Sequence, residues 1–172
     1  YLQGSLYNTR IQVGRDSLWW GPGYHGSLLL SNNAFPFDMI RFDNDRPIRF
    51  PWIFEKLGPT NIEYFITRLE EKRQVPRAYF LGFRMEINPF PFANFGFSRT
   101  IIFGGEGAPR PSVGDYLKIF IPEQENKLGV LDNDQKISLD FRMRIPPPDG
   151  FLSFLGYGFE LYGEIAGEDD ET

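Results

Sequence analysis

The chain has 172 residues, a net charge of −5 and no cysteine, which excludes disulfides, thiolate metal ligands and a cysteine nucleophile. No long basic block is present, so nucleic acid is not an expected partner, and no apolar run reaches the roughly 18 residues of a membrane helix. Aromatic residues make up 17% of the chain, beside 18 Gly and 14 Pro. This composition favours strands joined by turns, in one domain or in part of a larger one.

The first predicted element is a strand over residues 6–15, which runs into an unusual aromatic loop. Trp19 and Trp20 are followed directly by Gly21-Pro22-Gly23, and a short apolar run then meets Ser31-Asn32-Asn33. Two indoles bring a large apolar surface with one N–H each, and the glycines and proline impose a sharp change of direction. We interpret the whole of residues 20–54 as a long irregular loop, longer than a connector in a compact domain.

The middle of the chain predicts a further strand and a hairpin. Residues 61–69 are rich in β-branched and aromatic side chains, which favours a strand over an amphipathic helix. Residues 79–88 alternate apolar and polar, Pro89-Phe90-Pro91 forms a turn, and residues 94–103 run back. Arg99 breaks the apolar face of the returning strand, so we expect a membrane interface, a bulge or a different register at that position.

The clearest strand covers residues 136–145, where apolar and polar side chains alternate strictly. Pro146-Pro147-Pro148-Asp149-Gly150 ends it, and a second alternating strand is expected from about residue 154 to 165. This gives six predicted strands in all. Irregular stretches are expected at residues 104–115 and 122–134.

Alternation alone fits two opposite architectures. In a soluble sandwich the apolar faces meet in a core, whereas in an outer-membrane barrel they face lipid and the charged faces line the lumen. In a barrel, Asp140, Arg142 and Arg144 would line the wet interior, paired with Glu160 and Glu164 across the sheet.

The Trp-Trp-Gly-Pro-Gly segment resembles the signature of the capsule-assembly Wzi-type family of outer-membrane β-barrel proteins. Later segments that carry the same resemblance, in the same order, are Leu30 to Phe37, Phe97 to Thr100, Phe103 to Gly107 and Leu161 to Asp169. Family members are much longer, so the resemblance identifies residues 1–172 as an incomplete segment of a single β-barrel domain. Six strands cannot close this barrel without leaving open edges in lipid.

The resemblance implies an all-β, antiparallel, transmembrane barrel segment in the bacterial outer membrane. It further implies a non-enzymatic, lectin-like protein that binds capsular or extracellular polysaccharide and helps capsule assembly at the cell surface. Its expected partners are that polysaccharide, outer-membrane lipid and other chains that complete the barrel or complex, and no cofactor is expected. We place Leu139, Phe141, Leu81 and Phe83 outward, with Arg142 and Glu86 inward.

The 20–54 loop is predicted to plug or cover the lumen. Its four prolines cannot donate backbone hydrogen bonds, so much of it cannot lie against lipid. Its apolar residues should not extend freely into water either. The interior or one mouth of the barrel is the remaining place, and the Trp19-Trp20 pair would anchor the start of the plug.

Catalytic and metal chemistry find little support in the sequence. His25 is the only histidine, and no nucleophile elbow accompanies it. Gly104 to Gly107 lacks the Lys-Ser/Thr ending of a phosphate loop. A soluble carbohydrate-active enzyme that uses loop carboxylates remains an alternative, with candidates Glu106, Asp115, Asp132, Asp134, Glu160 and Glu164. A purely structural barrel segment of a larger complex is the third interpretation.

Six residues are the predicted ligand-binding set. Aromatic faces stack on apolar sugar faces, and arginine, amide and carboxylate groups match hydroxyls. The set is Arg15, Trp19, Trp20, Asn32, Asn33 and Glu106. Competing roles remain open: the tryptophans can belong to an interfacial belt or fill the lumen, and the asparagines can stabilise a turn.

Overall fold

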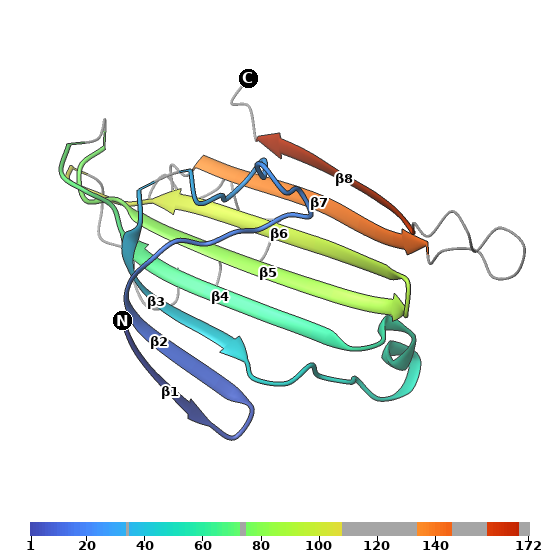
Figure 1. Cartoon of the computed structure of the whole chain (residues 1–172). Helices are drawn as coiled ribbons and strands as arrows, with labels where there is room; N and C mark the ends of the chain where they lie inside the picture. Colours follow the sequence, from blue (N-terminus) through green and yellow to red (C-terminus); the bar gives the residue numbers. More distant parts are fainter. Residues whose placement is uncertain (34, 73–74, 108–133, 146–157, 169–172) are drawn as a thin grey trace, which may run out of the picture.

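The computed structural model describes residues 1–33, 35–72, 75–107, 134–145 and 158–168. Its strands form one antiparallel sheet in which each strand pairs with its neighbours in sequence (Figure 1). They are β1 (Leu2–Leu6), β2 (Thr9–Asp16), β3 (Phe37–Asn44), β4 (Thr60–Arg68), β5 (Tyr79–Phe90), β6 (Ala93–Phe103), β7 (Asp134–Ile145) and β8 (Phe159–Glu168). A 3-10 helix, η1 (Trp52–Leu57), precedes β4. The all-β antiparallel fold predicted from the sequence is confirmed.

One prediction about the elements is wrong, and one strand was not predicted. The 20–54 stretch is not one irregular loop, because residues Phe37–Asn44 form β3 between β2 and β4. The strand expected over residues 6–15 corresponds to β2, and β1, which a two-residue turn at Tyr7 and Asn8 joins to it, was not predicted as a separate strand. The described residues therefore form eight strands where six were expected.

One face of the sheet is apolar because alternate residues of every long strand point to the same side. The register places Ile40, Ile66, Leu81 and Ile101 in one continuous cross-strand row. Towards β8 the face is open, with Leu139 55% and Ile165 69% exposed. In the middle it is closed, where Leu81, Ile101 and Phe103 form a buried cluster with partly buried aromatic and aliphatic neighbours.

The predicted division of these residues between two opposite faces is confirmed, and the outward direction of the apolar face stays a prediction. Leu81 and Phe83 lie on the apolar face of β5, and Leu139 and Phe141 lie on the same face of β7. Glu86 and Arg142 point to the opposite face. Because all described strands belong to one sheet, Leu81 and Phe141 are not packed between two sheets formed by those strands.

Arg99 keeps the apolar-face position that made it anomalous. Its neighbours Phe83 and Ile137 are in regular register, so neither a bulge nor a misassigned register explains it. The register shift in this hairpin falls at Ile87 and Phe90 instead. Arg99 Nε donates a 3.1 Å hydrogen bond to Gln135 Oε1, also on the apolar face.

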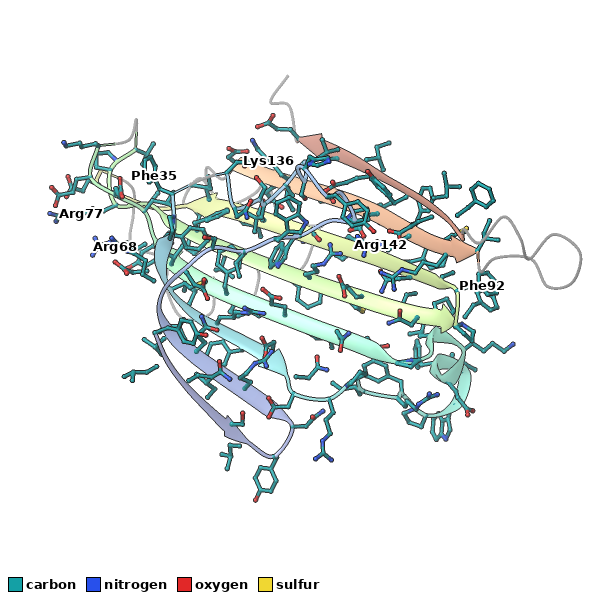
Figure 2. The ribbon with its side chains drawn as sticks, in the orientation of Figure 1. Phe35, Arg68, Arg77, Phe92, Lys136 and Arg142 are labelled. Atoms are coloured by element: carbon teal, nitrogen blue, oxygen red, sulfur yellow. The ribbon has the colours of Figure 1, made fainter. Side chains whose placement is uncertain are left out.

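The two ends of the sheet differ in their connections (Figure 1). One end carries the two-residue turns at Tyr7-Asn8 and Pro91-Phe92, together with the β3–β4 connection, which contains η1, and the β7–β8 connection. The other end, which we call the loop-rich end, carries the connections β2–β3, β4–β5 and β6–β7. Phe35, Arg68 and Arg77 lie at the loop-rich end and Phe92 at the opposite one (Figure 2). Among the described residues, no helix has the length and apolar character needed to cross a bilayer.

Candidate functional site on the polar face

Residues 17–33, here called the crossing segment, run from the end of β2 over the polar face of the sheet (Figure 1). They reach Glu63 on β4, Arg142 on β7 and Glu164 on β8, so they span most of the width of the sheet. Two distinct sets of contacts hold the segment in place. One is aromatic and the other is charged.

The aromatic set, here called the anchor, surrounds Trp20. Leu18 and Trp20 pack on Met39 and Phe65, with flanking Leu29, Leu30, Phe37 and Phe80. Trp20 is 1% exposed and its ring centroid lies 5.2 Å from that of Phe65. Gly82 makes this approach possible, because a Cβ there would lie 2.1 Å from Phe65 Cε1 and 2.6 Å from the Trp20 ring. A side chain at position 82 and the docked indole exclude each other.

The indole N–H of Trp20 finds a charged acceptor below the anchor. It donates a 3.0 Å hydrogen bond to Glu63 Oε1. Arg41 donates to the second Glu63 oxygen at 3.1 Å and lies 2.9 Å from Asp43. The buried polar atom of the tryptophan is therefore satisfied, as a buried indole requires.

The charged set holds residues 22–28, here called the strap. Tyr24 Oη donates to Glu160 at 2.7 Å, and the Leu28 amide donates to Glu164 Oε2 at 3.0 Å. Ser27 Oγ also lies 3.1 Å from Glu164 Oε1. Arg142 donates to the Pro22 carbonyl, and its guanidinium carbon lies 5.3 Å from the Tyr24 ring centroid. Arg142 is labelled in Figure 2. The hydrogen bond to the Glu160 carboxylate raises the pKa of the Tyr24 phenol above its ordinary value.

A buried ion-pair network lies beside the strap. Arg84 is bidentate to Asp140, at 2.7 and 3.1 Å, and also donates to Glu86 and Ser98. The side chains of Arg84 and Asp140 are only 5% and 1% exposed. Gly96 faces this carboxylate across the strands, and a Cβ there would lie 2.4 Å from Asp140 Oδ2. The glycine thus provides the space in which the buried pair forms.

A polar cavity of about 190 Å³ separates part of the strap from the sheet. Gly21 and Pro22 line it from above. The sheet contributes Arg84, Glu86, Asn88, Asn94, Asp140, Arg142 and Arg144. Arg142 and Arg144 both lie close to Glu160, at 3.1 and 3.3 Å. The predicted pairing of these arginines with Glu160 across β7 and β8 is confirmed, whereas Asp140 pairs with Arg84 and Glu164 binds the strap.

The six predicted ligand residues do not form one cluster. Arg15 is exposed on the apolar face of β2 and pairs with Asp38 at 2.8 Å. Asn32 and Asn33 are exposed just before β3, and Glu106 is exposed and pairs with Arg77 at 3.2 Å. These four residues share the loop-rich end. Trp19 is half-buried.

Trp20 requires a correction. We predicted that the Trp20 ring stacks on a sugar. The side chain is only 1% exposed, so neither face of the ring is accessible for stacking. Because Trp20 is buried against Phe65 and Gly82, it holds the crossing segment on the sheet.

The candidate catalytic residues in the described part of the chain do not form one cluster, and two of them already accept hydrogen bonds from the strap. Asp115 and Asp132 lie outside the described residues. Glu160 and Glu164 accept hydrogen bonds from the strap, and His25 is exposed within it. Within the described ranges, no three His, Cys, Asp or Glu side chains are grouped as a metal site requires.

Sequence reasoning missed Arg84, Glu63 and Arg41. All three point to the polar face of their strands, which the period-two pattern does indicate. A search for charges on that face would have found them, although not their partners. Arg84 and Asp140 are 56 residues apart in the chain.

The described sheet has one lipid-compatible face and one charged face, and a polypeptide segment lies over the charged face. Together these features define the class of protein. Such a sheet forms part of the wall of an outer-membrane β-barrel, with the polar face turned to the lumen. The comparisons with known proteins agree with this class and narrow it to a family.

The model of the family described as capsule assembly protein Wzi matches residues 1–172. A solved Escherichia coli structure, described as Wzi, an outer membrane protein involved in group 1 capsule assembly and a carbohydrate-binding β-barrel, superposes with a TM-score of 0.72. It is 25% identical and the match covers 98% of this chain and 34% of that one. An uncharacterized 55.8 kDa protein in the cps region of Klebsiella pneumoniae is 28% identical over 168 residues, 96% of this chain and 32% of the relative.

The chain belongs to the Wzi capsule-assembly family. It forms part of an outer-membrane β-barrel, as the resemblance of the Trp-Trp segment implied. It spans about a third of the length of the relatives it matches.

Proposed function

We propose that the barrel containing this chain binds capsular or extracellular polysaccharide without chemically altering it, and so helps to assemble the capsule at the cell surface. The observation that carries the proposal is the loop-rich end of the sheet, which has four exposed polar residues: Arg15, Asn32, Asn33 and Glu106. Longer loops of outer-membrane barrels face the exterior. Family membership and the carbohydrate-binding description of the E. coli structure support the proposal.

The crossing segment is proposed to constrict the lumen. It lies over the polar face, fixed by the anchor at β4 and β5 and by the strap contacts at β7 and β8. The constricting part is residues 17–33 and not the whole of 20–54, because β3 belongs to the barrel wall. This position supports a closed or narrowed barrel over an open diffusion pore.

Binding is tested with the full-length protein and purified capsular polysaccharide from the producing strain. We expect retention on immobilised polysaccharide, reduced when Asn32 and Asn33 are both replaced by Ala. The double change Lys56→Ala and Arg46→Ala, at the opposite end of the sheet, is the matched control. Equal binding by both variants contradicts the assignment of the loop-rich end.

The enzymatic alternative is tested on the same material. Release of reducing sugar ends during prolonged incubation would identify a hydrolase, and its loss in a Glu160→Gln or Glu164→Gln variant would assign the carboxylates. We expect the polysaccharide to keep its length.

Constriction is tested by replacing residues 22–28 with a short Gly-Ser linker in the full-length protein and recording single-channel conductance. Deletion of the wider stretch 28–51 is unsuitable because it removes β3. We expect conductance to rise. An unchanged conductance means that the strap does not limit the pore.

A further inference from the structure

The cavity beneath Gly21 and Pro22 has two chemically different sides. On one side, Glu86 and Asp140 surround Arg84, so two carboxylates share one guanidinium. On the other, Arg142 and Arg144 share the single carboxylate of Glu160. The lining therefore has a carboxylate-rich side and an arginine-rich side within about 190 Å³.

The arginine-rich side has unused donor capacity. Arg144 is 66% exposed and reaches Glu160 only at 3.3 Å through Nε, while that carboxylate also accepts from Tyr24. A guanidinium offers five N–H donors in a planar fork that matches a carboxylate. An incoming carboxylate would thus find a partner at Arg144 without breaking the buried Arg84–Asp140 pair.

The carboxylate-rich side suits hydroxyl groups. Glu86 is partly exposed at 34% of its side chain, and ionised carboxylates accept hydrogen bonds from alcohols. Asn94, which pairs in register with Arg142 and donates to Asn88 at 3.0 Å, also lines the cavity and retains its carbonyl oxygen as an acceptor. The volume corresponds to about six waters at roughly 30 Å³ each, comparable with one sugar ring and its hydroxyls.

We infer that this cavity binds a single acidic sugar unit, with its carboxylate against Arg144 and Arg142 and its hydroxyls against Glu86 and Asn94. The inference deepens the proposed function and rests on it, since it names the chemistry of one bound unit of the polysaccharide. A neutral hexose would leave the arginine-rich side without an anion. A small inorganic anion would leave the hydroxyl-accepting side unfilled.

The position of the cavity separates this site from the loop-rich end. Asn88 and Asn94 flank the turn that joins β5 to β6, and Arg144 is the penultimate residue of β7. All three lie at the end that carries the two-residue turns, opposite Asn32 and Glu106. The protein would therefore contact an acidic polymer at two places along the barrel axis.

The test uses the full-length protein in lipid nanodiscs and two probes that differ only at C6, methyl glucuronide and methyl glucoside. Ligand-observed NMR or calorimetry gives the affinities. We expect the glucuronide to bind at least about tenfold more tightly, and Arg144→Gln to remove most of that difference. Lys136→Gln is the matched control, a cation on the same strand and face that pairs with Glu168 at 2.9 Å, away from the cavity.

The outcomes separate the site from the proposed function. Equal affinity for the two probes, or equal losses in Arg144→Gln and Lys136→Gln, overturns the inference even if whole polysaccharide still binds. Glucuronide binding that depends on Arg144, in a protein that does not bind the polysaccharide, upholds the cavity and rejects the proposed function.

Discussion

The two halves of the crossing segment are held on the sheet by different kinds of interaction. Around Trp20 the contacts are apolar and closed to water, with Trp20 and Phe65 at 1% and 0% exposure. Around Tyr24 they are hydrogen bonds to charged side chains and a cation–π contact with Arg142, and Tyr24 itself is 59% exposed. One short stretch of chain thus joins a buried anchor to a solvated strap.

The difference predicts unequal strength. Apolar burial yields about 25 cal/mol per Å², whereas a typical hydrogen bond contributes only about 0.5–1.5 kcal/mol net, because water competes for the same groups. The anchor should therefore keep the segment on the sheet, while the strap can detach and reattach. Removing parts of either half tests this division, beginning with the change of largest effect.

Gly82→Val should prevent the anchor from forming. The added Cβ would overlap the Phe65 ring and the Trp20 indole, which lie 2.1 and 2.6 Å from its position. Both rings are also packed against other side chains, so relief is costly. We expect little folded protein, measured as the heat-modifiable band on a gel after refolding. Gly167→Val, where nothing lies within 4 Å of the added atom, should refold normally.

Trp20→Ala should cost about 3–5 kcal/mol, because it leaves a cavity between Phe65 and Gly82 and an unpaired Glu63 oxygen. Urea unfolding of the full-length protein in lipid measures the loss. Trp19→Ala, at a half-buried position one residue earlier, is the control and should cost clearly less. Similar losses for the two variants would show that Trp20 has no special part in the anchor.

The anchor also explains which strands could be predicted from the sequence. β7 alternates cleanly because its two faces meet different surroundings along its whole length. β3 was missed because its pattern is reversed near the loop-rich end. Phe37 and Met39 point to the polar face to meet the anchor, while Asp38 points to the apolar face and pairs with Arg15.

The β1–β2 turn was missed for a local reason. Two-residue hairpin turns usually reveal themselves by Asn-Gly or Asp-Gly, whose residues accept positive φ. Here Tyr7 adopts a φ of 55°, and Asn8 follows it. A tyrosine in that position carries no turn signal, so the strand predicted over residues 6–15 extended across the turn and β1 was not counted as a separate strand.

The site could be predicted only in outline. The Trp-Trp-Gly-Pro-Gly segment was correctly identified as the informative one, and the charged face of β7 and β8 was predicted to pair across the sheet. The contact between this segment and the charged face of β7 and β8 could not be predicted, because Tyr24 and Glu160 are 136 residues apart in sequence. The expected stacking role of Trp20 failed because the partner that buries it, Phe65, lies on the otherwise polar face of β4.

Asp140→Asn tests whether buried charge beside the strap supports the sheet as strongly as the anchor does. Arg84 would keep Glu86 but lose its bidentate partner in a site where its side chain is 5% exposed. Breaking a buried pair costs about 3–5 kcal/mol, and the remaining Glu86 places this case at the low end. Urea unfolding measures it. Lys136→Gln, which breaks an exposed pair on the same strand, should change stability by less than about 1 kcal/mol.

Tyr24→Phe should have the smallest effect, confined to the strap. The ring and its contact with Arg142 remain, and only the hydrogen bond to Glu160 is lost. The unfolding midpoint should stay unchanged, while single-channel recordings show more frequent brief openings.

The same hydrogen bond raises the pKa of Tyr24, so the neutral phenol is favoured when the strap is docked. The contribution of this hydrogen bond is therefore complete below the ordinary tyrosine pKa of about 10. As the pH rises through the raised pKa, the phenol ionises beside Glu160 and the contact is lost. The wild-type protein should therefore acquire the opening frequency of the variant at high pH, and the variant should show no corresponding change. If wild type and variant respond to pH in the same way, the hydrogen bond does not control the strap.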